Sequence, residues 1–76
     1  MNTIEKLTYM ANQIARNFAN HGDGAAEATA HHLARFWDPG MRAKILARLD
    51  EPDRGGLSPI AAKAVASLAD KGDLKS

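Results

Sequence analysis

Apolar residues near the start of the chain recur at alternating steps of three and four, the spacing of one face of an α-helix. This stripe consists of Ile4, Leu7, Ala11, Ile14 and Phe18, and Met10 widens it. Thr3 precedes it as a candidate N-cap, and the segment NHGDG at residues 20–24 ends it, because Gly and Asn tolerate left-handed backbone. The pattern predicts an amphipathic helix from Ile4 to Phe18, with Met10 in the core and Tyr9 at its rim.

A second helix is predicted from about Gly24 to Phe36, with Asp23 able to bond its first backbone amides. Its apolar stripe is rich in small residues and gains bulk only at the end: Ala26, Thr29, Ala30, Leu33 and Trp37. Asp38-Pro39 then marks a new start, because Pro suits the first helical position and Asp38 can cap it. The sequence FWDP therefore predicts a corner between two helices.

Two shorter helices follow. The first is predicted from Pro39 to about Leu49, with one apolar face made of Met41, Ile45, Leu46 and Leu49. The segment DEPDRGG at residues 50–56 has the composition of a polar linker, and Ser58-Pro59 repeats the capping pattern of the corner. A fourth helix is predicted from there to about Asp70, and residues 72–76 are expected to form a frayed tail. Its apolar stripe is Ile60, Ala61, Ala64, Val65 and Leu68, with Leu57 just ahead.

These elements predict an all-α protein, a small irregular (orthogonal) bundle of about four short helices in a single domain, residues 1–76. A core of this size supplies roughly 3–5 kcal/mol of stability. The chain has no Cys, which excludes disulfides and thiolate metal sites. Association with another protein is therefore the expected source of added stability.

The charge pattern gives little support to nucleic acid as a partner. Ten Lys and Arg residues stand against nine Asp and Glu residues, for a net charge of +1, and the two signs are interspersed. No apolar run approaches the roughly 20 residues that span a bilayer, and Glu5 and Lys6 interrupt the N-terminus where a signal peptide would be apolar. We expect a cytoplasmic protein with neither nucleic-acid nor membrane binding.

The histidines and hydroxyls do not form a recognisable catalytic or metal-binding motif. His31 and His32 are adjacent, so they point about 100° apart on a helix, and Glu27 with His31 makes only a two-ligand pair. The chain lacks a Gly-rich phosphate loop, a nucleophile elbow and the spacing of zinc proteases. Ser58 is better explained as a helix cap. We therefore predict no catalytic residue, bound cofactor or metal, and expect the histidines, His21 included, in surface or hydrogen-bonding roles.

Two interpretations of the corner differ in whether Trp37 is buried or exposed. An indole buries some 150–250 Å², so it is a natural anchor for an alanine-rich core. Alternatively, Phe36, Trp37, Met41 and Arg42 form an exposed docking patch, because Trp, Met and Arg are enriched at the centres of protein interfaces. The two interpretations are compatible if the ring lies half in each environment.

Several segments together resemble the delta subunit family of NAD-dependent, molybdenum-containing formate dehydrogenases. They are LTYMANQIARNF at residues 7–18, AHHLARFWDPGMRAKIL at residues 30–46 and LSPIAAKAV at residues 57–65. The most specific pieces are the run from Tyr9 to Ile14 and the FWDP corner followed by Met41 and Arg42. Gly40 departs from the family pattern, which has Arg at that place, so a partner contact through that Arg is in doubt here.

The resemblance implies a non-catalytic accessory subunit of a soluble bacterial complex that interconverts formate and carbon dioxide with NAD. Other subunits would hold the bis-molybdopterin guanine dinucleotide centre, the iron-sulfur clusters and the flavin, and this chain none of them. Its lack of Cys and of a dinucleotide fingerprint agrees with that division. The implied role is to stabilise the large molybdenum-containing subunit or to assist its assembly.

The sequence thus predicts a docking subunit with two contact regions. The candidate partner-binding residues are Tyr9, Asn12, Gln13, Phe36, Trp37, Met41 and Arg42. Asn12 and Gln13 supply amide donors and acceptors for a partner's backbone. The alternative is a free-standing helical assembly factor or regulator that binds a protein target transiently. A spare apolar face would also permit a homodimer when the chain is isolated.

Overall fold

The computed structural model describes residues 2–70, and the regular structure in that range is entirely helical. The α-helices are α1 (Thr3–Asn17), α2 (Ala25–Phe36), α3 (Pro39–Leu46) and α4 (Pro59–Asp70), and three 3₁₀ segments connect them, Ala19–Gly24, Ala47–Asp50 and Pro52–Gly56. The predicted all-α fold with four short helices is therefore confirmed for these residues. The predicted tail, residues 72–76, lies outside them.

The first helix begins one residue earlier than predicted. Asn2, not Thr3, is the N-cap: its side-chain oxygen accepts the backbone N–H of Glu5 at 2.8 Å. The Glu5 carboxylate in turn accepts the backbone N–H of Asn2 at 3.1 Å. This reciprocal capping box satisfies two backbone donors at once, which a Thr3 cap would not achieve with Glu5.

The buried face of α1 is rotated from the predicted one. Its buried residues are Leu7, Thr8, Ala11 and Ala15. Met10 is 42% exposed, so its predicted core position was wrong, whereas Tyr9, 59% exposed, lies outside the core as expected. The Thr8 hydroxyl donates to the Ile4 carbonyl at 2.8 Å, which is how a polar side chain enters the core at low cost.

The connection between α1 and α2 is a 3₁₀ segment that changes direction at Gly22, where φ is +62°. Only glycine adopts this backbone conformation without strain. The second helix starts at Ala25 after Gly24, and no side chain caps it, so the predicted Asp23 cap was wrong. The buried residues Thr29, Ala30 and Leu33 do follow the predicted stripe.

The third helix ends at Leu46 instead of near Leu49, because the chain tightens into the 3₁₀ turn Ala47–Asp50. The predicted polar linker is also ordered: it contains a 3₁₀ turn with positive φ at Asp53, Arg54 and Gly55. The Arg48 guanidinium closes this loop by donating to the Gly55 carbonyl at 2.7 Å.

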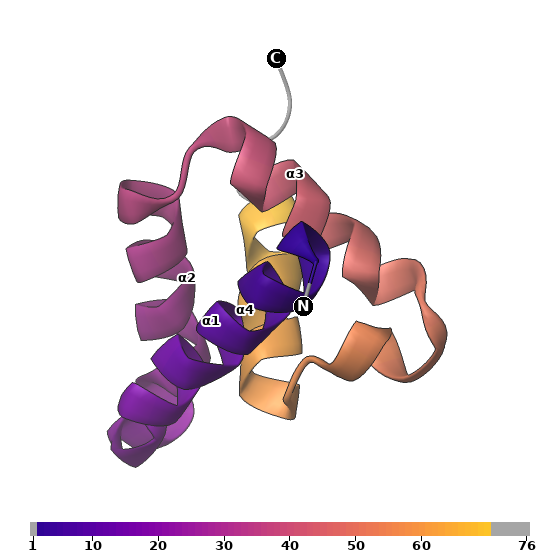
Figure 1. Cartoon of the computed structure of the whole chain (residues 1–76). Helices are drawn as coiled ribbons and strands as arrows, with labels where there is room; N and C mark the ends of the chain where they lie inside the picture. The colour runs from indigo at the N-terminus through magenta and orange to yellow at the C-terminus, as the bar shows by residue number, and fades with distance from the viewer. Residues whose placement is uncertain (1, 71–76) are drawn as a thin grey trace.

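The fourth helix begins at Pro59, as predicted, and the Ser58 hydroxyl accepts the backbone N–H of Ala61 at 3.2 Å. It packs most extensively against α2, where small residues on both helices allow close approach. Figure 1 shows the helices crossing at different angles rather than lying parallel, with α1 passing in front of α4. The core cluster contains Leu7, Ala11, Ala15, Ala30, Leu33, Trp37, Ile45, Leu57, Ala61, Ala62, Ala64, Val65 and Leu68.

Candidate functional site

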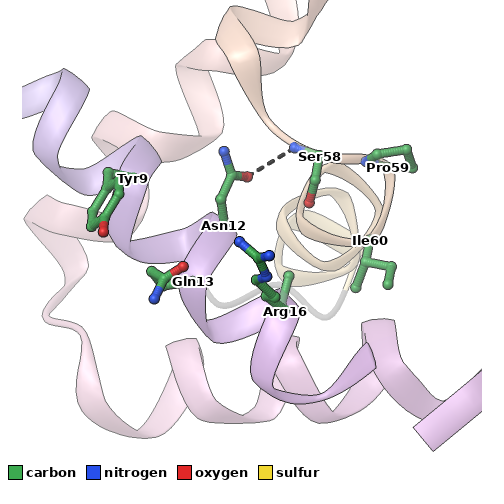
Figure 2. Close-up of a pocket in the computed structure, with 8 residues that line it drawn as sticks. Tyr9, Asn12, Gln13, Arg16, Ser58, Pro59 and Ile60 are labelled. Atoms are coloured by element: carbon green, nitrogen blue, oxygen red, sulfur yellow. Dashed lines mark hydrogen bonds between the residues drawn. The ribbon is translucent and has the colours of Figure 1, made fainter. Parts of the chain in front are cut away.

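A groove of about 570 Å³ lies between α1 and the first turn of α4 (Figure 2), and we name it the α1–α4 groove. Tyr9, Gln13 and Arg16 line it from α1, where steps of four and three residues put them on one face. The wall from α4 includes Pro59 and Ile60. The full lining is Tyr9, Asn12, Gln13, Ala15, Arg16, Ser58, Pro59 and Ile60.

Asn12 holds the two sides of this groove together. Its side-chain oxygen accepts the backbone N–H of Ser58 at 2.8 Å, and its amide nitrogen donates to the Gly56 carbonyl at 3.0 Å (Figure 2 draws the bond to Ser58). These bonds join α1 to the segment that starts α4. Both ends of the amide therefore make hydrogen bonds within the chain, which gives Asn12 a bracing role between the two walls of the groove.

The chemistry of the groove is an apolar wall with a polar margin. Ile60 is half-buried and Pro59 exposed, so their carbon surfaces face the opening. Across from them are the Tyr9 ring, the Gln13 amide and the Arg16 guanidinium, all three on exposed residues. Arg16 is the one charged residue among the described lining residues. Such a surface suits a protein segment, because Tyr and Arg are the residue types that dominate interface energetics.

At the FWDP corner, two adjacent aromatic residues have opposite environments. Trp37 is 5% exposed and belongs to the core cluster, while Phe36 is 68% exposed. Asp38 caps α3 as predicted, its carboxylate accepting the backbone N–H of Met41 at 2.8 Å. The corner is therefore confirmed, and the core interpretation of Trp37 is the one that the structure supports. Phe36 is the aromatic side chain that this corner presents outward.

Arg42 and Met41 support the corner from within. The Arg42 guanidinium donates to the Ala34 carbonyl at 3.2 Å and also to the Trp37 carbonyl, at the C-terminal end of α2. Met41 is half-buried and packs against the core cluster. A cation at a helix C-terminus satisfies carbonyls that the helix leaves open. Arg42 therefore has a structural role at the end of α2, and the partner contact predicted for it would be an additional role.

Gly40 lies on the exposed side of the corner. A Cβ at this position would approach Asp38 Oδ1 at 3.3 Å, a tight contact with the capping carboxylate. A longer side chain at this position would extend from an exposed site.

A row of four rings runs from Phe36 through His32 and Phe18 to His21. The His32 and Phe36 rings lie 4.6 Å apart between centroids, Phe18 and His32 lie 6.2 Å apart, and Phe18 and His21 meet edge to face at 5.3 Å. The Arg35 guanidinium lies 5.8 Å from the Phe36 centroid. We name Phe18, His21, His32 and Phe36 the ring cluster. In this arrangement His21 and His32 act as packing partners of phenylalanine.

Residues 2–70 were also compared with the requirements of a metal site and of a membrane span. They contain no group of three or more His, Cys, Asp or Glu side chains placed to hold a metal ion. Within the same range, each helix is too short or too polar to cross a membrane.

The structure brings together Tyr9, Asn12 and Gln13 in the α1–α4 groove, and Phe36, Trp37, Met41 and Arg42 at the corner. Sequence reasoning missed Arg16, although its spacing of seven from Tyr9 is a signal for a shared helix face. It also missed the stacking of His32 on Phe36, which the i, i+4 spacing could have indicated. Nothing in the sequence pairs Ile60 with α1.

Comparison with known proteins places the chain by a family model. The family model described as NADH-dependent formate dehydrogenase delta subunit FdsD matches residues 6–65, which include most of α1, the corner and the first half of α4. Neither the curated proteins nor the solved structures contain a significant match to the chain. Because the family model covers most of the 76 residues, the chain belongs to the family of NADH-dependent formate dehydrogenase delta subunits.

Proposed function

We propose that this chain is a non-catalytic accessory subunit that docks on the large, molybdenum-containing subunit of a formate dehydrogenase complex and stabilises it. The observation that carries this proposal is the α1–α4 groove, a preformed hollow with an apolar wall on a protein whose family is named for its place in such a complex. A small chain that joins a larger assembly needs a surface of this kind.

The seven predicted residues take two different roles in this proposal. Tyr9, Gln13 and Phe36 have exposed side chains and contact the partner directly. The remaining residues act by holding those side chains in place. They are Asn12, which joins the walls of the groove, and Trp37, Met41 and Arg42, which build the corner beneath Phe36.

The chemistry of formate oxidation belongs to other subunits in this proposal. The chain has no Cys to ligate an iron-sulfur cluster and no glycine-rich dinucleotide fingerprint. It would act in the cytoplasm, where an NAD-linked complex finds its cofactor. Docking would stabilise this chain as well as the large subunit. Burial of Tyr9 and Phe36 in an interface adds stability that a 76-residue core does not supply alone.

The test is co-purification of an affinity-tagged copy of the chain with the large subunit, both expressed in one host. We expect Tyr9→Ser and Phe36→Ser each to weaken the complex by roughly tenfold or more, because truncated aromatic anchors cost that much at interface centres. Met10→Ser is the matched control, since Met10 is an exposed apolar neighbour of Tyr9 that does not line the groove.

The unaltered chain must co-elute with the large subunit, and Met10→Ser must behave like it. Failure of the unaltered chain to bind would contradict the proposed function. Equal binding by all three variants would instead mean that docking uses another surface.

A further inference from the structure

The α1–α4 groove carries a positive charge that its own lining does not balance. Its eight described lining residues include Arg16 and no carboxylate. Arg16 is exposed, and Figure 2 shows its side chain extending from α1 into the space between α1 and the first turn of α4, opposite Ile60. A partner that places an acidic group here gains an ion pair without displacing an acid from the groove lining.

Besides this positive charge, the groove has an apolar wall formed by Pro59 and Ile60. Pro59 and the half-buried Ile60 line one end of a volume of about 570 Å³ and the Tyr9 ring lines the other, so the groove exceeds the space of a single side chain. A free phosphate gains nothing from such a wall, and one guanidinium is a poor match for the several negative charges of a nucleotide. A polypeptide segment with adjacent apolar and acidic side chains fits both features.

The groove is also fixed before any partner arrives. The two Asn12 hydrogen bonds tie α1 to the start of α4, and the Ser58 hydroxyl caps α4 at the same point. Binding therefore does not have to order these walls, which lowers its entropic cost.

From these observations, and resting on the proposed function, we infer that the α1–α4 groove receives a segment of the large subunit in which a bulky apolar side chain stands next to an Asp or Glu. The apolar side chain packs between Tyr9 and the Pro59 and Ile60 wall. The carboxylate pairs with the Arg16 guanidinium. Tyr9 to Arg16 spans about two helical turns, roughly 10 Å, and this distance is the upper limit for the separation of the two partner side chains.

The first experiment looks for the partner's carboxylate directly. Arg16→Lys keeps the positive charge and supplies an amine, which a zero-length carbodiimide reagent joins to a carboxylate in contact with it. The purified complex of the Arg16→Lys chain with the large subunit is treated with the reagent, digested and analysed by mass spectrometry. We expect a peptide containing position 16 joined to an Asp or Glu of the large subunit, beside a bulky apolar residue.

The second experiment measures affinity. Arg16→Glu should weaken binding roughly tenfold, and added salt should narrow the difference from the unaltered chain, because the pair is partly exposed. Lys44→Glu is the matched control: Lys44 is also an exposed cation in the last turn of its helix, so the change has the same unfavourable effect on the helix dipole. Ile60→Glu should weaken binding and Ile60→Leu should not, with circular dichroism confirming that each variant is folded.

The outcomes separate this inference from the proposed function. A complex that forms normally, tolerates Arg16→Glu and gives no cross-link at position 16 would overturn the inference and leave the docking role intact. A cross-link from position 16 to a second copy of this chain would overturn it as well. If the unaltered chain does not bind the large subunit at all, the proposed function itself fails.

Discussion

Phe36 and Trp37 are neighbours in sequence, yet one faces outward and the other is enclosed in the core. The reason is local: α2 ends at Phe36, and Trp37 takes extended backbone with φ −96° and ψ 141°, which turns its side chain off the helical path. Asp38 and Pro39 then start α3 in a new direction. The sequence predicted the corner but not which ring it would bury, because that depends on how α2 packs against α4.

Replacement of these two residues by alanine should therefore have unequal effects. Trp37→Ala removes the largest side chain of a small core, and we expect a loss of about 3–5 kcal/mol in the free energy of unfolding. That loss equals the whole stability expected of such a core. Phe36→Ala should change the free energy of unfolding by less than about 1 kcal/mol, because the ring is already exposed.

Urea denaturation followed by far-ultraviolet circular dichroism measures both variants. A folded, stable Trp37→Ala chain would contradict the core assignment of the indole.

Asn12, which the sequence suggested as a partner contact, joins α1 to the start of α4 in the structure. Asn12→Ala leaves the Ser58 N–H and the Gly56 carbonyl without their partners, so we expect a loss of about 1–3 kcal/mol in the free energy of unfolding. Gln13→Ala is the control, since its exposed side chain should contribute less than about 0.5 kcal/mol. Thermal unfolding of both variants checks the comparison, and equal midpoints would show that Asn12 does not hold the groove.

Among the elements, α1 shows what the periodicity of apolar residues can and cannot predict. The spacing of apolar residues predicted the helix and the burial of Leu7 and Ala11, but it placed Met10 inside and omitted Thr8. Close packing against α4 favours the side with small residues such as Ala15, and a threonine can join that side by bonding its own helix. The hydrophobicity of the residues predicts neither the preference for small side chains at this contact nor the burial of a threonine.

The end of α2 depends on a side chain from α3. Arg42 donates to carbonyls at that end, while its buried Nε–H has no acceptor among residues 2–70, which reduces the net gain. We expect Arg42→Met to lower the free energy of unfolding by about 1–2 kcal/mol, because it keeps the aliphatic stem and removes the donors. Lys44→Met, on the exposed side of the same helix, should have little effect.

Chemical denaturation of the isolated chain distinguishes these two variants. Should Arg42→Met match the unaltered chain in stability and lose only its binding to the large subunit, Arg42 would be a partner contact and not a structural clamp.

At the scale of the whole molecule, the four α-helices of residues 2–70 enclose a core built largely from alanine, leucine and one tryptophan. The fold class followed from sequence because α1, α2 and α4 carry periodic apolar stripes, and Asp38-Pro39 and Ser58-Pro59 mark the starts of α3 and α4. The α1–α4 groove did not, because Ile60 and Tyr9 are 51 positions apart and meet only through packing. The resemblance in the segments that contain Tyr9 and the FWDP corner supplied the link to formate dehydrogenase, and the family match confirms it.

The central claim is that this chain is a permanent accessory subunit docked on the large subunit. Native mass spectrometry of the mature enzyme, purified from its host through a tag on the large subunit, tests it most directly. We predict one copy of this 8.2 kDa chain per large subunit, retained through repeated purification steps. Its absence from the mature enzyme, or a substoichiometric amount that appears only before cofactor insertion, would contradict the claim and identify the chain as an assembly factor instead.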